Sequence, residues 1–201
     1  MFITLEGIDG SGKTTLTGLL AEKLRQPPHN RDVVITREPG GTAIAESIRT
    51  VLLENDAATI PAVSQILLFW SARIAHNQQL IIPALEAGKC VICDRYIDST
   101  YVYQGLQAHG ADILGKVEAC LKQDFVMPQT TLLIDVDVDL AWQRRSNRLN
   151  LNHFDKLGKD EMAHRKVAYL QRAAQSPHRI KVIDGNQPVD KVLLACLDAV
   201  L

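Results

Sequence analysis

The feature that most constrains this chain is a glycine-rich loop between two regular elements near its N-terminus. It reads Gly7-Ile8-Asp9-Gly10-Ser11-Gly12-Lys13-Thr14, which matches the G-x-x-x-x-G-K-[ST] phosphate loop. An apolar, strand-prone segment at 2–6 precedes the loop, and leucines at 16, 19, 20 and 24 mark one face of a helix after it. In this context backbone N–H groups and the helix dipole can converge on phosphate oxygens. The sequence therefore predicts a nucleoside triphosphate site, with the Lys13 charge near the outer phosphates and the Thr14 hydroxyl on Mg²⁺.

Apolar segments separated by long helical patterns predict a parallel α/β sheet. The expected strands are residues 2–6, 32–36, 90–93, 131–136 and 180–183, and helices are expected over 43–53, over 62–87 and after residue 188. This alternation indicates a five-stranded parallel sheet flanked by helices in one domain, 1–201. Together with the phosphate-loop motif, it predicts a three-layer sandwich of the P-loop NTPase type. A polar stretch with glycine at about 144–159 is a candidate for a mobile lid, and a solvated helix face is the alternative.

Composition excludes several classes of partner. The chain has 201 residues with 22 Lys and Arg against 23 Asp and Glu, so no basic field favours nucleic acid. No apolar stretch approaches the length of a membrane span, so we expect a cytoplasmic protein with neither nucleic acid nor membrane as a partner. Cys90 and Cys93 form a C-x-x-C pattern, but on a strand they point to opposite faces, and we expect both to pack as small apolar side chains.

Polar residues follow two of the expected strands. Asp94 and Arg95 end the third strand, where a carboxylate fits a Walker-B-type Mg²⁺ position and an arginine fits a phosphate clamp. The second strand runs into a rigid polar segment, Thr36-Arg37-Glu38-Pro39-Gly40-Gly41-Thr42. Because the carboxyl ends of parallel strands meet at one crevice, these groups are expected beside the phosphate loop. A purely structural Asp–Arg pair is the alternative.

The long helix carries a third cluster. Phe69, Arg73 and His76 are spaced four and three residues apart, hence near one face. An aromatic ring with an arginine one turn further on could stack on a base and donate a hydrogen bond to it. Core packing is the alternative for Phe69, and packing is the interpretation for Trp70.

Together with Asp94-Arg95-Tyr96 and the following Ser99, Tyr103, Gln104 and Gly105, these segments resemble bacterial thymidylate kinases in order and spacing. The resemblance runs from residue 2 to about residue 196, and the combination is highly specific although each piece alone is not. It implies the reaction ATP + dTMP → ADP + dTDP in dTTP biosynthesis, with Mg²⁺, on a P-loop kinase sheet, in a homodimer.

The resemblance also implies roles for individual residues. Gly7 to Thr14 would hold the ATP phosphates, and Thr14 with Asp94 would hold Mg²⁺. Phe69 would stack on thymine, and Arg73 would donate to its O4. Around the rest of dTMP, the implied contacts are Asp9 at the 3′-OH, Thr100 at the base edge, Tyr103 against C2′, Arg95 on the phosphate, and Arg37, Pro39, Arg49 and Gln104 nearby.

The position of an arginine cluster indicates which of two types within the family this chain resembles. The phosphate loop has Gly10-Ser11 and no arginine, whereas Arg144, Arg145 and Arg148 cluster in the polar stretch, which resembles the lid-arginine type. We therefore expect Arg144 and Arg148, with Lys13 and Arg95, to offset the charge of the transferred phosphoryl. Gln129 after Pro128, where the family usually has Asp, and few acidic residues after Arg148 leave the lid register open.

Two other functions compete with this interpretation. A different nucleoside monophosphate or a deoxynucleoside could be the acceptor, although Phe69, Arg73 and Tyr103 together favour thymidylate. A regulatory P-loop switch would need switch segments in place of an acceptor pocket, and the segments 37–42 and 94–105 are too rich in anion-binding groups to favour it.

Overall fold

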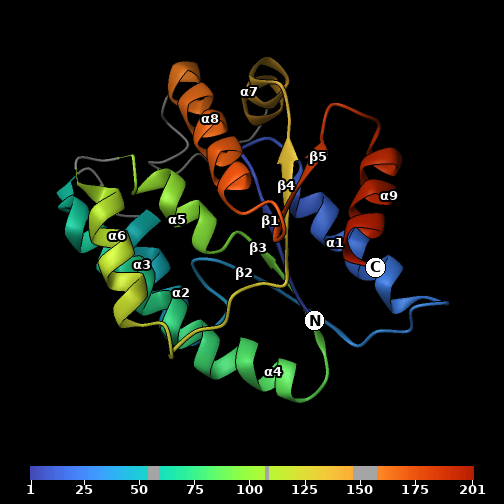
Figure 1. Cartoon of the computed structure of the whole chain (residues 1–201), viewed down its shortest axis with the longest axis horizontal. Coiled ribbons are helices and arrows are strands. Elements are labelled where there is room, and N and C mark those ends of the chain that lie inside the picture. The colour runs from blue at the N-terminus through green and yellow to red at the C-terminus, as the bar shows by residue number, and fades with distance from the viewer. Residues whose placement is uncertain (54–58, 107–108, 147–157) are drawn as a thin grey trace.

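The computed structural model describes residues 1–53, 59–106, 109–146 and 158–201. Its centre is a five-stranded, wholly parallel sheet in the order β2-β3-β1-β4-β5 (Figure 1). The strands are β1 (Phe2–Glu6), β2 (Val33–Arg37), β3 (Cys90–Asp94), β4 (Thr130–Asp135) and β5 (Ile180–Asp184). Each boundary lies within one residue of the expected segment, because each strand is a short run of mostly apolar, largely β-branched residues. The predicted α/β sheet is confirmed.

Helices connect the strands on both faces of the sheet. In chain order they are α1 (Lys13–Arg25), α2 (Ala43–Leu53), α3 (Ala62–His76), the π-helical segment η2 (Asn77–Ile81), α4 (Ile82–Glu86), α5 (Ile97–Tyr103), α6 (Gly110–Cys120), α7 (Val138–Ser146), α8 (Lys159–Gln175) and α9 (Val189–Val200). The predicted helix over 62–87 is one continuous run through α3, η2 and α4. At its π turn the Asn77 side chain donates to the Arg73 carbonyl and to the Tyr96 hydroxyl, both at 2.9 Å.

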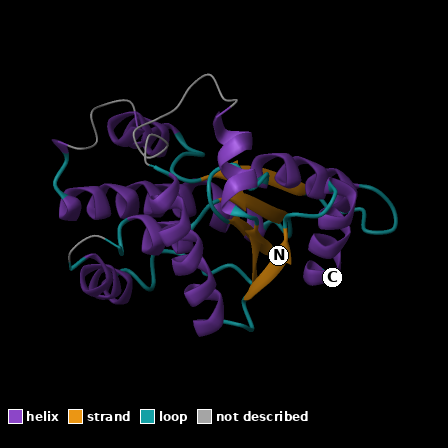
Figure 2. Ribbon diagram, turned by 90° about the horizontal axis from the view of Figure 1, so that it is seen from above, coloured by secondary structure: helices purple, strands orange, loops and turns teal. Residues whose placement is uncertain are grey.

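Helices flank the sheet on both sides, as Figure 2 shows from above. An apolar layer lies between the helices and each face of the sheet. On one face Ile3 and Ile92 pack against α1 and α9, and on the other Phe2 and Val91 pack against α3 and α6. Cys90 belongs to the first layer and Cys93 to the second, which confirms the opposite orientations expected from the strand. Within the described ranges no helix is long and apolar enough to cross a membrane.

A third apolar cluster joins α5, α7 and α8 to the start of the phosphate loop and includes Ile8 and Tyr169. Only the two ends of the predicted lid at 144–159 lie within the described residues. Arg144 and Arg145 lie in the last turn of α7, whereas residues 147–157, Arg148 among them, lie outside the described residues. Arg145 is buried, with its guanidinium 4.4 Å from the Trp142 ring centroid, so it packs α7 against its neighbours.

Candidate active site

The phosphate loop needs glycine where its backbone turns. Gly10 has φ +87°, and a Cβ there would lie 2.2 Å from the carbonyl oxygen of Ala141. Gly12 has φ +92° and immediately precedes α1. Any other L-residue would be strained at these two positions, so the loop can pass tightly between β1 and α1 only with glycine.

Lys13 stands inside this loop as a buried cation. Its Nζ donates to the carbonyls of Gly7 and Ile8, both at 2.9 Å, and to Ser11 Oγ at 3.3 Å. Burial, followed by the charge of Arg95, lowers the pKa of Lys13 to about 8. The ammonium group is therefore still mostly protonated at neutral pH, and an arriving phosphate would stabilise that charge.

A hydroxyl and a carboxylate meet at the start of α1. Thr14 Oγ1 donates to Asp94 Oδ2 at 2.7 Å, although the two residues are 80 positions apart. The parallel pairing of β1 with β3, which sets Leu5 opposite Asp94, brings them together. Hydroxyl and carboxylate oxygens beside bound phosphates are the donor set that suits Mg²⁺, so these two residues fit that ion.

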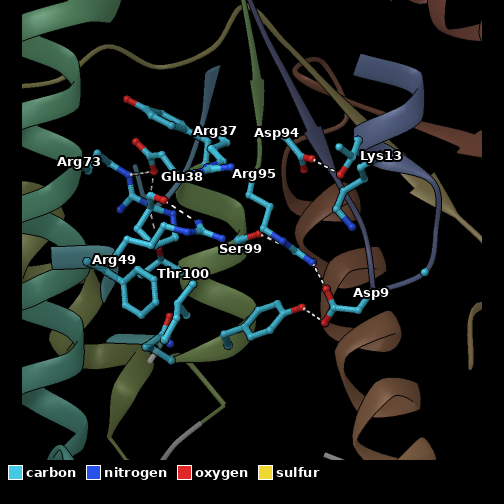
Figure 3. Close-up of a pocket in the computed structure, with 18 of the residues that line it drawn as sticks. Asp9, Lys13, Arg37, Glu38, Arg49, Arg73, Asp94, Arg95, Ser99 and Thr100 are labelled. Carbon is cyan, nitrogen blue, oxygen red and sulfur yellow. Dashed lines mark hydrogen bonds and ion pairs between the residues drawn. The ribbon is translucent and has the colours of Figure 1, made fainter. Parts of the chain in front are cut away.

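Arg95 occupies the centre of the site, between Asp9 and the group around Arg73 (Figure 3). Its φ of +70° is unusual for a residue with a side chain and turns the chain sharply after β3. Nη2 pairs with Asp9 Oδ1, and the Tyr103 hydroxyl donates to Asp9 Oδ2 at 2.8 Å. Burial alone would raise the pKa of Asp9, but Arg95 and Lys13 hold it at about 2. Asp9 is thus a fixed anion that orients Arg95.

Arg73 lies on the other side of the cavity and is buried with Glu38. Its Nε donates to Glu38 Oε2 at 2.9 Å and its Nη2 to Thr100 Oγ1 at 2.8 Å. His76 Nδ1 lies 3.2 Å from the second Glu38 oxygen. In the described part of the chain, Arg73 Nη1 and both amide atoms of Gln104 are buried without a hydrogen-bond partner.

These residues surround one cavity of about 270 Å³, close to the lower range of ligand sites. The sequence-predicted residues that line it are Asp9, Gly10, Gly12, Lys13, Thr14, Arg37, Pro39, Arg49, Phe69, Arg73, Asp94, Arg95, Thr100, Tyr103 and Gln104. Of the described residues that were also predicted, Gly7, Ile8, Ser11 and Arg144 do not line it, and Arg144 is exposed on α7.

The two outer arginines differ in how they are held. Arg37 is 57% exposed in its side chain and lies 3.3 Å from Glu46. Arg49 donates from Nη1 to the Pro39 carbonyl at 2.7 Å and is only partly exposed. Arg49 is therefore the less exposed of the two and has the shorter hydrogen bond.

The structure adds residues that the sequence did not single out. Arg165, on α8, stacks 4.0 Å from the Tyr103 ring centroid, and its Nη1 lies 4.0 Å from Asp9 Oδ2. One turn further on, the Tyr169 hydroxyl accepts from Arg95 Nη1 at 3.1 Å. Their spacing of four along an amphipathic helix was a local signal, but nothing local indicated which surface that face meets.

A phosphate loop, an oxygen pair suited to Mg²⁺ and a second cationic pocket at the carboxyl ends of parallel strands define a nucleotide phosphotransferase. Comparison with known proteins narrows the class. The family model for thymidylate kinase matches residues 5–194, and the chain belongs to the thymidylate kinase family. It is accordingly an ATP-dependent nucleotide kinase, as the resemblance of its motifs implied.

Relatives match along the whole chain. The thymidylate kinase of Ruegeria pomeroyi is 41% identical over 207 residues, covering 100% of this chain and 94% of the relative. That of Ectopseudomonas mendocina is 41% identical over 203 residues, with the same coverage. The crystal structure of thymidylate kinase from Ehrlichia chaffeensis is 35% identical with a TM-score of 0.75, covering 98% of this chain and 96% of that one.

Proposed function

We propose that this chain transfers the γ-phosphoryl of ATP to dTMP, giving dTDP, with dTMP in the cavity between Arg95 and Arg73. The observation that carries the proposal is the set of buried, unpaired atoms of Arg73 and Gln104. Buried polar groups are nearly always hydrogen-bonded, so an unpaired set beside a cavity indicates a polar ligand. The set comprises Arg73 Nη1 as a donor and an amide that both donates and accepts.

This set is complementary to thymine. The pyrimidine edge offers O4 and O2 as acceptors and N3–H as a donor, which can meet Arg73 and the Gln104 amide. Cytosine carries an amino donor in place of O4 and would oppose the Arg73 donor, leaving both groups unpaired at a substantial cost. Phe69, which lines the same cavity, supplies an apolar ring for stacking.

The sugar and phosphate contacts follow from the same placement. Tyr103 is held by Asp9 and by the guanidinium of Arg165, so its ring is a fixed wall that a 2′-hydroxyl would meet. Arg95 would bind the acceptor phosphate, whose oxygen is already a competent nucleophile and needs no general base. Lys13 would neutralise charge on the transferred phosphoryl.

Further parts of the proposal rest on the family resemblance. Thr14 and Asp94 would hold Mg²⁺, which would supply positive charge to offset the negative charge of the ATP phosphates. Arg144 and Arg148 would approach the phosphoryl group from a lid at about 144–159 of a single domain, 1–201. The enzyme would act as a homodimer in the cytoplasm.

An ADP-release assay with a panel of acceptors tests this proposal. With ATP and Mg²⁺, dTMP should be the best acceptor, dUMP weaker because it lacks the methyl group, and dCMP and ribothymidylate poor. A reaction without acceptor measures background hydrolysis. ADP release that does not depend on dTMP, or a preference for dCMP, would contradict the proposal.

A further inference from the structure

A carboxylate that does not line the cavity lies behind Arg95, on the residue immediately before the phosphate loop. Glu6 ends β1 and is 1% exposed. Its Oε1 accepts the backbone N–H groups of Tyr96 at 2.8 Å and Ser99 at 3.2 Å. Its Oε2 accepts the hydroxyls of Ser99 at 2.6 Å and Tyr169 at 3.1 Å. Four donors from β3–α5 and α8 thus converge on one buried side chain.

The same two hydroxyls also face the guanidinium of Arg95. Arg95 Nη1 donates to Ser99 Oγ at 3.0 Å and to the Tyr169 hydroxyl at 3.1 Å. A guanidinium can only donate, and each hydroxyl has one proton, so both oxygens must turn lone pairs toward Arg95. The two hydroxyl oxygens lie 2.9 Å apart, so one of them could donate to the other, but only one of the two protons can be used in this way. Glu6 Oε2 is within reach of both protons, and an ionised carboxylate can only accept. The carboxylate can therefore take both protons and leave both hydroxyl oxygens free to accept from Arg95.

We propose that Glu6 is a positioning residue that orients the hydroxyls of Ser99 and Tyr169 toward Arg95, and that through Tyr169 it ties helix α8 to the phosphate clamp. The inference rests on the proposed function, because it takes Arg95 as the group that binds the acceptor phosphate. Without these acceptors Nη1 would keep only the Gly7 carbonyl at 3.2 Å, and Asp9 alone would orient the far side of the guanidinium. Arg95 would then sample orientations that do not fit the phosphate.

The ionisation state of Glu6 controls this arrangement. A protonated carboxyl group would donate to one of the hydroxyls, and that hydroxyl would have to direct its own proton toward the other hydroxyl or toward Arg95. The two hydroxyl protons would then no longer both point away from the guanidinium. Burial and the neighbouring charge of Asp98 raise the pKa of Glu6 to about 7, against a smaller opposing effect of Arg95. The titratable and charged groups around it are Lys13 on α1, Cys93, Arg95 and Asp98 at the β3–α5 connection, Tyr169 on α8 and Arg179 before β5.

Three variants test the proposal. Tyr169→Phe removes one hydroxyl, Glu6→Gln replaces the acceptor oxygens, and Tyr101→Phe removes a phenol hydroxyl on α5 that bonds Glu118 instead. We expect Tyr169→Phe to lower kcat/KM for dTMP about tenfold, as a lost hydrogen bond to a charged group does, with KM for ATP and the melting temperature nearly unchanged. Tyr101→Phe should match the wild type.

The pH profile separates positioning from packing. Wild-type kcat/KM for dTMP should rise with pH through about 7 as Glu6 ionises. The phosphate of dTMP has its own ionisation at about pH 6 in every variant, so we expect Glu6→Gln to be slower and to keep only that lower rise. Tyr169→Phe performing like Tyr101→Phe, or a Glu6→Gln profile with the same shape as that of the wild type, overturns the inference. If Glu6→Gln fails to fold, Tyr169→Phe still decides. A wild type that does not phosphorylate dTMP refutes the proposed function instead.

Discussion

Replacing Arg73 by Met should damage stability and substrate binding for two separable reasons. Arg73 and Glu38 form a buried ion pair, with side chains 1% and 4% exposed. Removing the cation leaves the Glu38 carboxylate buried beside His76 without its main partner, and such a change typically costs about 3–5 kcal/mol of unfolding free energy. The same substitution deletes Nη1, the donor proposed for thymine O4. A charge-assisted hydrogen bond is worth about 1.5–3 kcal/mol, so Kd for dTMP should rise about 10- to 150-fold.

A double variant separates the two effects. Arg73→Met combined with Glu38→Gln removes both charges, so the free energy of unfolding should return to within about 1 kcal/mol of wild type. Affinity for dTMP should stay low, because Nη1 is still missing. Urea unfolding gives the stabilities, and calorimetric titration gives Kd for dTMP and for ATP. Equal weakening of both nucleotides, or recovery of dTMP affinity in the double variant, would refute the reasoning.

Four further substitutions test other parts of the site. Lys13→Ala should abolish turnover while circular dichroism and the melting temperature stay near wild type, and an unchanged kcat would contradict the role of the loop. Among Arg144→Ala and Arg148→Ala, at least one should lower kcat about 10³-fold with Kd for dTMP unchanged, whereas wild-type kcat in both would exclude the lid hypothesis. Arg95 and Lys13 hold the pKa of Asp9 at about 2, so its ionised form stabilises the fold above about pH 4, and this contribution is lost as the pH falls toward 2. In Asp9→Asn the free energy of unfolding should therefore fall by about 2 kcal/mol less than in the wild type as the pH is lowered through this range. The same pH dependence in both proteins would count against the Asp9–Arg95 pair.

Local pattern was enough to place the sheet and the phosphate loop. The strands are short apolar runs, and the loop is specified by glycines that its backbone angles require, so both can be recognised within a few residues. The bounds of α2, Ala43–Leu53, agree with the sequence prediction for a similar reason, because its apolar positions repeat with helical period.

Contacts between distant segments could not be predicted in this way. Tyr169 reaches Arg95 only because α8 packs across the start of the phosphate loop, an arrangement set by the third apolar cluster. Nor did the polar segment at 36–42 indicate that Glu38 would hold Arg73 inside the protein. Composition grouped Arg145 with a mobile lid, yet the structure buries it in the last turn of α7, where its Nη1 donates to Met162 Sδ on α8. In each case tertiary packing, which one sequence does not display, decides the role of a charged side chain.

The most direct test of the account is a crystal structure of the protein with dTMP bound. We expect the pyrimidine to stack on Phe69, with O4 within hydrogen-bonding distance of Arg73 Nη1, the Gln104 amide paired to the base edge, and the phosphate on Arg95. The three buried, unpaired atoms of Arg73 and Gln104 would then have partners. A base bound elsewhere, or one that leaves Arg73 Nη1 and the Gln104 amide unpaired, would contradict the assignment of this cavity to thymidylate.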